Sequence, residues 1–162
     1  VVAPFIHSPA RIPDFSKVRR VLFVCYGNIN RSPFAEEYAR ARFAESHMPI
    51  EVRSAGTAAR PGTPATLQAQ GAIAQYGTTL AGHRAQRISS ELVSWADTII
   101  YMDNTNRAAL LEAFPDTGDK MYSLASVAGM REISDPDGLS QSMYTDVFTH
   151  IARAINALIE RA

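Results

Sequence analysis

The chain has 162 residues, 46% of them hydrophobic and 20% charged, which excludes a disordered, collagen-like or coiled-coil protein and suits one compact domain. Sixteen Lys and Arg residues balance sixteen Asp and Glu residues, so the chain lacks the positive field with which proteins attract nucleic acid or an anionic membrane. Cys25 is the only cysteine, which excludes an intramolecular disulfide and a cysteine-rich metal site and favours a reducing compartment.

Residues 1–18 are predicted to form an irregular N-terminal extension rather than part of the core, because they contain three prolines and show no apolar periodicity. The first strand is predicted at Arg20–Cys25, a continuous run of β-branched and aromatic residues that is typical of a strand buried on both faces of a parallel sheet. No internal repeat or flexible linker follows, so residues 19–162 are expected to form a single domain.

Strands and helices alternate along the rest of the chain. A helix is expected to begin near Pro33, because proline suits the first helical turn and apolar residues then recur at three- and four-residue spacings. The clearest periodicity lies in the last segment, where the apolar residues from Tyr144 to Ile159 share one face. Further strands are predicted at Ile50–Ser54, Asp97–Met102 and Lys120–Leu124, and further helices at Thr63–Tyr76 and Asn104–Phe114.

This alternation predicts an α/β fold with an open four-stranded parallel sheet and helices on both faces. In such folds the ligand binds at the carboxyl ends of the strands. Cys25 ends the first predicted strand, so we expect the functional site there.

The turn after this strand reads CYGNINRSP at residues 25–33, which places five residues between a cysteine and an arginine. A loop this short at a helix N-terminus points its backbone N–H groups inward and forms a cradle for an anion such as phosphate. Gly27 permits close turning, and Asn28 tolerates left-handed backbone conformations. The spacing therefore predicts a phosphate site.

Each polar group of this loop has a chemical role in that interpretation. Arg31 can place its planar guanidinium on two phosphate oxygens, which a lysine cannot do. The cradle should stabilise the thiolate form of Cys25, which is the nucleophilic form, and Ser32 can donate its hydroxyl to that thiolate. A buried structural thiol and an ordinary N-terminal helix serine are the alternatives, but the spacing favours catalysis.

Attack on a phosphate monoester also needs an acid that protonates the leaving oxygen and then activates water. The segment SDPDG at residues 134–138 lies between the last predicted strand and the last helix, where a turn can overhang the sheet end. Either Asp135 or Asp137 can serve. Asp and Pro are common turn residues, so the segment by itself also fits a plain turn.

Residues 24–33, VCYGNINRSP, resemble the signature loop of the low-molecular-weight protein tyrosine phosphatases, in which Cys-x5-Arg-Ser follows the first strand. Three further segments are similar to this family: RSAG at 53–56, GHRA at 82–85 and YMD at 101–103. Asp135 falls where the family keeps its general acid. The resemblance covers roughly residues 20–162 and implies a flavodoxin-like three-layer fold.

The resemblance implies hydrolysis of phosphotyrosine through a cysteinyl-phosphate intermediate, with Cys25, Arg31 and Asp135 as catalytic residues and neither a metal nor an organic cofactor. The implied phosphate-binding loop comprises Tyr26, Gly27, Asn28, Ile29, Asn30, Arg31 and Ser32. Its implied supporting hydrogen-bond network comprises Asn28, Ser32, Ser54 and His83. Without the resemblance, His83 is interpreted as a surface or capping histidine.

A phosphotyrosine-containing protein is the implied partner. In bacteria the family often opposes tyrosine kinases of polysaccharide export, which makes a bacterial tyrosine kinase a candidate substrate. Binding to nucleic acid or a membrane is not expected. A cytoplasmic location is expected, because the chain has neither an apolar run of about 20 residues nor a signal-peptide pattern.

The chain departs from the family near the expected substrate. Asn30 stands where a second loop cysteine is common, and Asp137 and Gly138 stand where aromatic residues often follow Asp-Pro. Residues 57–61 also lack the aromatic residue often found on the opposite wall. Preference for phosphotyrosine should therefore be modest unless another aromatic supplies a wall, for which Tyr26 and Tyr144 are the candidates. Ile29 favours phosphotyrosine by resemblance.

Two other functions fit parts of this pattern. A phosphatase of the same mechanism can act on another phosphomonoester or on phosphoarginine, and a non-catalytic module can simply bind phosphate. The module is disfavoured because Cys25, Arg31 and a loop aspartate are all present. Arsenate reduction on the same fold requires additional cysteines for a disulfide relay. This activity is disfavoured because Cys25 is the only cysteine of the chain.

Overall fold

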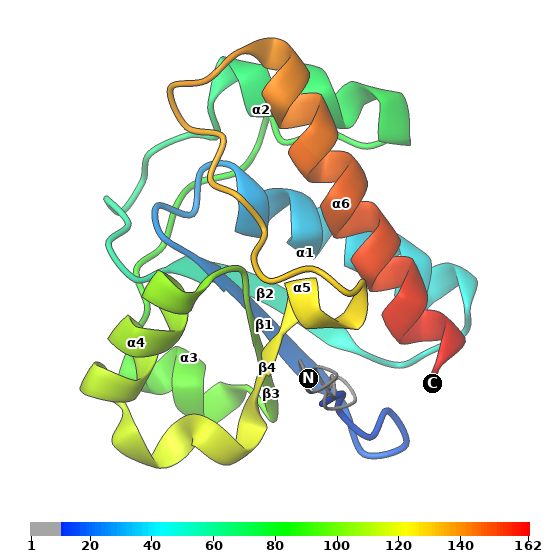
Figure 1. Ribbon diagram of the computed structural model, residues 1–162, viewed down its shortest axis with the longest axis vertical. Helices are drawn as coiled ribbons and strands as arrows, with labels where there is room; N and C mark the ends of the chain where they lie inside the picture. The colour runs from blue at the N-terminus through cyan, green and yellow to red at the C-terminus, as the bar shows by residue number, and fades with distance from the viewer. Residues whose placement is uncertain (1–10) are drawn as a thin grey trace, which may run out of the picture.

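The computed structural model describes residues 11–162, and a parallel sheet of four strands lies at its centre (Figure 1). The strand order is β2-β1-β3-β4, and all three neighbouring pairs are parallel. The strands are β1 (Arg20–Cys25), β2 (Glu51–Gly56), β3 (Thr98–Tyr101) and β4 (Met121–Ser123). The predicted α/β fold is confirmed. The chain leaves β1 toward β2 on one side and returns to β3 on the other, so the end of β1 is the topological switch point at which ligands bind.

Helices cover both faces of this sheet (Figure 1). One face carries α1, α2, α5 and α6, and the other carries α3 and α4. The α-helices are α1 (Arg31–Glu45), α2 (Leu67–Ile73), α3 (Ser90–Trp95), α4 (Asn104–Ala113), α5 (Leu124–Val127) and α6 (Gln141–Glu160). The 3-10 helices are η1 (Ala74–Tyr76) and η2 (Pro115–Lys120). The three-layer arrangement agrees with the prediction.

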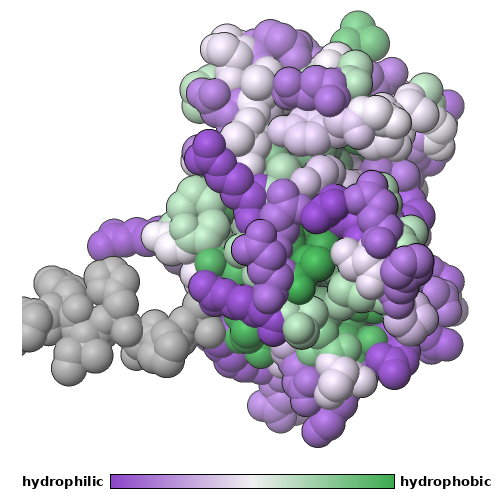
Figure 2. Space-filling model, turned by 90° about the vertical axis from the view of Figure 1, so that its right-hand side faces the viewer, coloured by the Kyte–Doolittle hydropathy of each residue, from purple (hydrophilic) through white to green (hydrophobic). Residues whose placement is uncertain are grey.

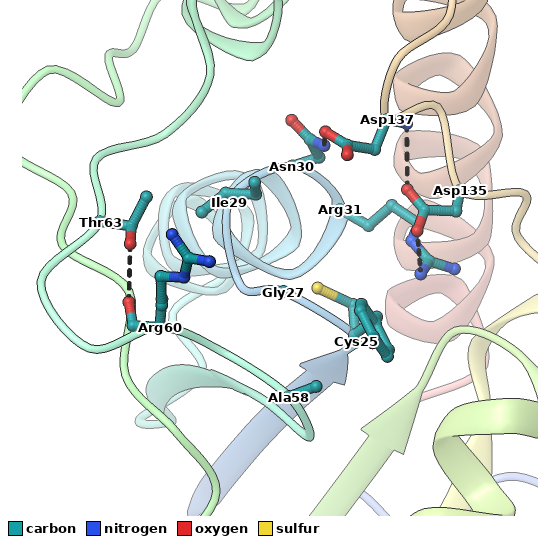
Figure 3. Close-up of a pocket in the computed structure, with 11 residues that line it drawn as sticks. Cys25, Gly27, Ile29, Asn30, Arg31, Ala58, Arg60, Thr63, Asp135 and Asp137 are labelled. Carbon is teal, nitrogen blue, oxygen red and sulfur yellow. Dashed lines mark hydrogen bonds and ion pairs between the residues drawn. The ribbon is translucent and has the colours of Figure 1, made fainter.

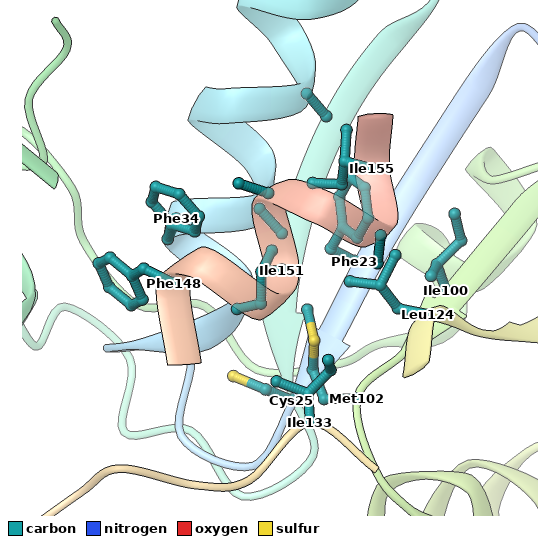
Figure 4. Close-up of a cluster of buried hydrophobic side chains, with 14 of the residues drawn as sticks. Phe23, Cys25, Phe34, Ile100, Met102, Leu124, Ile133, Phe148, Ile151 and Ile155 are labelled. Carbon is teal, nitrogen blue, oxygen red and sulfur yellow. The ribbon is translucent and has the colours of Figure 1, made fainter. Parts of the chain in front are cut away.

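Alternate side chains of β1 point into the two opposite cores. Val21, Phe23 and Cys25 belong to the larger cluster beneath α1 and α6 (Figure 4), and Leu22 and Val24 belong to the cluster beneath α3 and α4. All five residues are at most 3% exposed, as the continuous apolar run predicts. Cys25 is therefore held at the end of a strand that is paired on both edges.

Aromatic packing fixes α1 relative to the last helix. Phe34 of α1 and Phe148 of α6 are fully buried, and their rings stack with centroids 4.1 Å apart (Figure 4). The ring of Tyr76 meets Phe34 edge-on at 4.9 Å. Pairs of this kind add about 0.5–1.5 kcal/mol beyond the burial of their surface. Since α1 begins at Arg31, this packing holds the helix N-terminus that faces the loop after β1.

The segment before β1 is irregular but contributes to the core, which corrects the expectation of a separate extension. Residues 11–18 contain no helix or strand, yet Phe15 and Val18 are buried in the larger cluster. The ring of Phe15 lies 6.1 Å from that of Phe43, and Arg11 donates a hydrogen bond to the Met121 carbonyl at 3.1 Å. Phe15 and Val18 are isolated apolar residues that create no periodic pattern, so their burial was not predicted. The rest of the predicted extension, residues 1–10, lies outside the described residues.

Several helix and strand boundaries differ from the prediction. The predicted helix Thr63–Tyr76 begins only at Leu67, because Thr66 acts as its N-cap and Pro64 disfavours helical backbone in the residue before it. Leu124, predicted to end a strand, begins α5. The short elements α3, α5 and η2 were not predicted, since none exceeds six residues and such lengths are too short for a periodic signal.

The face shown in Figure 2 is covered mainly by hydrophilic side chains, and its apolar areas are small and interrupted. Among residues 11–162, the exposed large apolar side chains are Tyr26, Leu67, Leu139 and Met143. No helix in this part of the chain has the combination of length and apolar character needed to cross a membrane. Tyr26 follows directly after β1, at the end of the sheet where the site is expected.

Candidate active site

The loop between β1 and α1 forms one side of a pocket of about 460 Å³, into which the Cys25 side chain points (Figure 3). Asn28 adopts a left-handed conformation with φ of 53°, which lets the loop close within a few residues. The other walls come from residues 58–63 and from Asp135 and Asp137. Of the predicted phosphate-binding residues, Tyr26, Gly27, Ile29, Asn30 and Arg31 line the pocket. Asn28 and Ser32 do not line it and are fully buried.

Asn28 is the centre of the predicted supporting network. Its Nδ2 donates to Ser32 Oγ at 2.9 Å and to Ser54 Oγ at 2.8 Å, and its main-chain oxygen lies 2.6 Å from His83 Nε2. The Ser32 hydroxyl accepts the Asn28 bond and can donate its own hydrogen to Cys25 Sγ at 2.9 Å, with the Ala55 carbonyl as a more distant acceptor at 3.4 Å. The structure thus brings the four predicted network residues together, next to the thiol.

Two residues that the sequence analysis missed extend this network. Glu36 accepts a hydrogen bond from Ser54 Oγ at 2.5 Å, and the main-chain N–H of Gln86 donates to Asn28 Oδ1 at 2.9 Å. Gln86 Nε2 also donates to the Ser54 carbonyl at 2.9 Å. Glu36 follows Ser32 by one helical turn on the same face, which is a signal that could have identified it. Gln86 carries no comparable signal.

Arg31 is buried and anchored before any substrate arrives. It is 1% exposed, and its Nη1 donates to Asp103 Oδ2 at 2.7 Å and to the Ile133 carbonyl at 2.8 Å. The Asp103 side chain also caps α4, so the carboxylate is itself held in place. Nη2 of Arg31 lies 3.5 Å from Asp135 Oδ2. The guanidinium is therefore fixed by the N-cap residue of α4 and by the segment after α5, with one edge toward the pocket residue Asp135.

The two candidate acids both reach the pocket, but they have different surroundings (Figure 3). Asp135 faces Arg31, and its side chain remains 42% exposed. Asp137 accepts a hydrogen bond from Asn30 Nδ2 at 3.1 Å. The main-chain N–H of Asp137 donates to Asp135 Oδ1 at 3.1 Å, which makes a turn typical of aspartate. Both aspartates are exposed, but Asp135 faces the guanidinium of Arg31 whereas Asp137 is hydrogen-bonded to the loop.

The family model of the low molecular weight phosphotyrosine protein phosphatases matches residues 20–162. The chain belongs to this family. The probable low molecular weight protein-tyrosine-phosphatase EpsP of Ralstonia nicotianae is 31% identical over 144 residues, covering 89% of this chain and 96% of that protein. The protein-arginine-phosphatase of Geobacillus stearothermophilus is 32% identical over 145 residues, covering 88% and 95%. The crystal structure of the low molecular weight protein tyrosine phosphatase from T. tengcongensis matches with a TM-score of 0.84 and 31% identity, over 89% of this chain and 99% of that one.

Membership in this phosphatase family confirms the predicted family and its cysteine-dependent chemistry. The walls of the pocket, however, are unusual for phosphotyrosine. Among residues 11–162, Tyr26, which is 53% exposed, is the one aromatic residue that lines the pocket. Tyr144, the other candidate wall, is 1% exposed and packs against Phe148 in the core, so that expectation was wrong. The rim opposite Asp135 carries the small side chain of Ala58 and the guanidinium of Arg60.

Proposed function

We propose that this phosphatase hydrolyses phosphotyrosine in proteins, with Cys25 as nucleophile, Arg31 as phosphate clamp and Asp135 as general acid. The observation that supports these roles is the convergence of the three side chains in one pocket at the carboxyl end of β1. Cys25 Sγ is in hydrogen-bond reach of Ser32, and the Arg31 guanidinium lies beside Asp135.

In the first step, the Cys25 thiolate attacks phosphorus, an S–P bond forms, and the P–O bond to the tyrosine oxygen breaks. The loop N–H groups and the donors of Arg31 that are not bound to Asp103 hold the phosphoryl oxygens. Asp135 gives its proton to the leaving oxygen, so that a neutral phenol departs rather than a phenolate. The Ser32 hydroxyl stabilises the thiolate before the attack and again when it is reformed.

In the second step, the carboxylate of Asp135 accepts a proton from a water molecule whose oxygen attacks phosphorus. The S–P bond breaks, inorganic phosphate leaves, and the proton remains on Asp135 for the next cycle. The exposure of Asp135 supports this role, since water must reach the carboxylate from solvent.

Two side chains of the pocket support phosphotyrosine as the substrate, although the rest of the wall formed by residues 11–162 is not aromatic. Ile29 provides an apolar surface beside the loop, and the exposed ring of Tyr26 can pack against a phenyl ring at the mouth. We further propose that the physiological substrate is a phosphoprotein, with a bacterial tyrosine kinase as the candidate. Phosphoarginine is the alternative, because a protein-arginine-phosphatase is related to this chain at 32% identity.

A matched peptide panel tests this proposal. One peptide sequence is prepared with phosphotyrosine, phosphoarginine or phosphoserine at the same position, and kcat/KM is measured for each. We expect the phosphotyrosine peptide to be hydrolysed fastest and Cys25→Ser to show no turnover. Faster hydrolysis of the phosphoarginine peptide would replace the proposed substrate with the alternative. Binding of phosphate without turnover of any peptide would instead indicate a phosphate-binding module.

A further inference from the structure

Asn30 does not use its side chain to cap the helix that it precedes. An asparagine at the N-cap usually accepts a hydrogen bond from a main-chain N–H of the first turn. Asn30 is the N-cap residue of α1 but makes no such bond. It is 4% exposed, and its amide faces two other segments instead: Nδ2 donates to Asp137 Oδ1, and Oδ1 accepts from Thr66 Oγ1 (Figure 3 shows the first contact). A buried amide thus joins the loop to the segment that carries Asp135.

The hydroxyl of Thr66 determines which way this amide points. Thr66 Oγ1 accepts a hydrogen bond from the Ala69 N–H at 3.1 Å, so its hydrogen is directed to Asn30 Oδ1, 2.6 Å away. The main-chain N–H of Thr66 also donates to the Ile29 carbonyl at 3.2 Å, which fixes the hydroxyl next to the loop. With its oxygen engaged by Thr66, Asn30 must present its NH2 group to the carboxylate of Asp137.

Asp137, which is held by Asn30, in turn restrains Asp135 through a hydrogen bond. The Asp137 carboxylate is held by Asn30 at 3.1 Å, and its main-chain N–H donates to Asp135 Oδ1 at 3.1 Å. Asp135 Oδ2 faces Arg31 at the longer distance of 3.5 Å. The side chain of Asp135 lies on a loop and is 42% exposed, so packing restrains it little. The orientation of its carboxyl group therefore depends on these few polar contacts.

We propose that Asn30 and Asp137 form a latch that positions Asp135 over the Cys25 thiol. In this role Asn30 and Asp137 are positioning residues, because they act on the reaction through Asp135. The proposal rests on the proposed function, in which Asp135 is the general acid. A hydrogen bond to a carboxylate is stronger than one between neutral groups, which makes Asn30 an effective anchor. A cysteine at this position, as is common in the family, has only a weak S–H donor to offer.

Isosteric substitutions, together with one truncation, test the latch. Asn30→Asp keeps an oxygen for Thr66 but replaces the donor to Asp137 with a repelling carboxylate. Asp137→Ala removes the acceptor, whereas Asp137→Asn keeps an oxygen that can accept the same bond. Combining Asn30→Asp with Asp137→Asn reverses donor and acceptor and restores a hydrogen bond with one negative charge. The native protein, Asn30→Asp, Asp137→Asn and the combined variant form a double-mutant cycle around this single contact, and Asp137→Ala is a separate deletion of the acceptor.

The readout is the ratio of kcat/KM for phenyl phosphate to that for 2,4-dinitrophenyl phosphate. Phenol leaves poorly and needs the acid, whereas dinitrophenol leaves without protonation. We expect Asn30→Asp and Asp137→Ala to lower this ratio by about tenfold or more. Asp137→Asn should lower it less than Asp137→Ala, and the combined variant should regain much of the ratio lost in Asn30→Asp. The inhibition constant for vanadate and the Tm of each variant show whether the cradle remains intact.

Two outcomes overturn the latch. Equal losses for both substrates in Asn30→Asp would indicate general damage to the loop, and an unchanged ratio in Asp137→Ala would show that Asp135 is positioned by other contacts. Asp135→Asn separates this proposal from the proposed function. If Asp135→Asn lowers the ratio but the latch variants do not, only the latch is wrong. If Asp135→Asn leaves the ratio unchanged, Asp135 is not the acid and the proposed mechanism is wrong.

Discussion

The carboxylate of Asp103 holds Arg31 in place, with Oδ2 at 2.7 Å from Nη1 of the guanidinium. The two residues are 72 positions apart in the chain, yet both are largely buried, with side-chain exposures of 2% and 15%. Nη1 also donates to the Ile133 carbonyl. Nη1 of Arg31 is therefore bound to its own scaffold, while Nη2 faces Asp135. In the proposed function the nitrogens other than Nη1 bind the phosphate, a division of roles that a single ammonium group cannot make.

In Arg31→Lys the cation at this position should consequently lose both its fixed orientation and its reach to the phosphate. We expect kcat/KM toward p-nitrophenyl phosphate to fall by about 10²-fold, as for other displacements of about 1 Å in an active site, and vanadate to bind more weakly. Arg60→Lys is the matched control, because Arg60 lines the same pocket but is exposed. Steady-state kinetics and vanadate inhibition measure both effects. Near-normal values for Arg31→Lys would mean that another cation holds the phosphate.

Loss of the Asp135 carboxyl group should slow hydrolysis more when the leaving group is more basic. Asp135→Asn is expected to slow hydrolysis of phosphotyrosine by about 10²–10⁴-fold, with a smaller effect on p-nitrophenyl phosphate because p-nitrophenolate leaves readily without a proton. Asp146→Asn, an exposed change on α6, serves as control. A harmless Asp135→Asn together with a crippling Asp137→Asn would reverse the assignment of the two aspartates.

Gly56 allows the second strand to end directly against the phosphate-binding loop. A Cβ atom at this position would lie 2.6 Å from the Tyr26 oxygen and 2.8 Å from the Asn28 nitrogen, both of which are main-chain atoms. Gly56→Ala must therefore push the loop away from its place. We expect it to destabilise the fold by about 1–3 kcal/mol, a cost typical of overpacking, and to lower kcat sharply.

Gly82→Ala is the control for this substitution, because a Cβ atom at Gly82 meets nothing within 4 Å. Urea unfolding and kcat are measured for both variants. A Gly56→Ala protein with normal stability and normal kcat would show that the loop tolerates the displacement.

The catalytic loop was predictable from the sequence because its determinants are local. The spacing of Cys25 and Arg31, a buried strand before them and a proline-initiated helix after them describe one continuous segment. The partners of that segment were not predictable in the same way. Asp103, which anchors Arg31, and Asp137, which contacts Asn30, lie 72 and 107 positions away from their partners. Only the folded sheet and the segment before α6 bring them together.

The features of the fold that the sequence analysis missed are short helices and isolated buried residues. Helix α5 has four residues and begins immediately after β4, so its cap at Ser123 gives no separate signal. Phe15 and Val18 join the core from an irregular segment without periodicity. The residues alone left Asp135 and Asp137 open as the acid, because both occupy the same turn and carry the same functional group, and both line the pocket. The family resemblance is what favours Asp135.

Tyr26 should supply most of the aromatic contribution to substrate preference, since no other aromatic residue in the described part of the chain lines the pocket. An aromatic contact contributes about 0.5–1.5 kcal/mol, so Tyr26→Ala should lower kcat/KM for phosphotyrosine by about two- to tenfold. Small alkyl phosphates should be affected less, so any preference of the native protein for aryl phosphates should shrink. Tyr26→Phe is the control that keeps the ring. Equal losses for aryl and alkyl phosphates would mean that Tyr26 shapes the loop rather than contacting the substrate.

Cys25 should be vulnerable to irreversible oxidation, because the chain offers no second thiol to protect it. Peroxide converts a thiolate to sulfenic acid, and a neighbouring cysteine normally captures that species as a disulfide before it oxidises further. Here Asn30 occupies the loop position at which the family often has that cysteine. We expect peroxide to inactivate the enzyme, phosphate to protect it by occupying the pocket, and recovery with dithiothreitol to decline as exposure lengthens.

The test uses pure protein without added thiol, because glutathione can cap the sulfenic acid reversibly. The mass of the Cys25 peptide should gain two oxygen atoms as recovery declines, which marks the sulfinic acid that dithiothreitol cannot reduce. Asn30→Cys should make the inactivation recoverable, although it also removes the amide that contacts Asp137. The fraction of activity recovered is therefore compared within each variant rather than between variants. Full recovery of the native protein after long exposure, with no change in that mass, would show that the sulfenic acid is protected without a second cysteine, for example as a cyclic sulfenamide with a main-chain nitrogen.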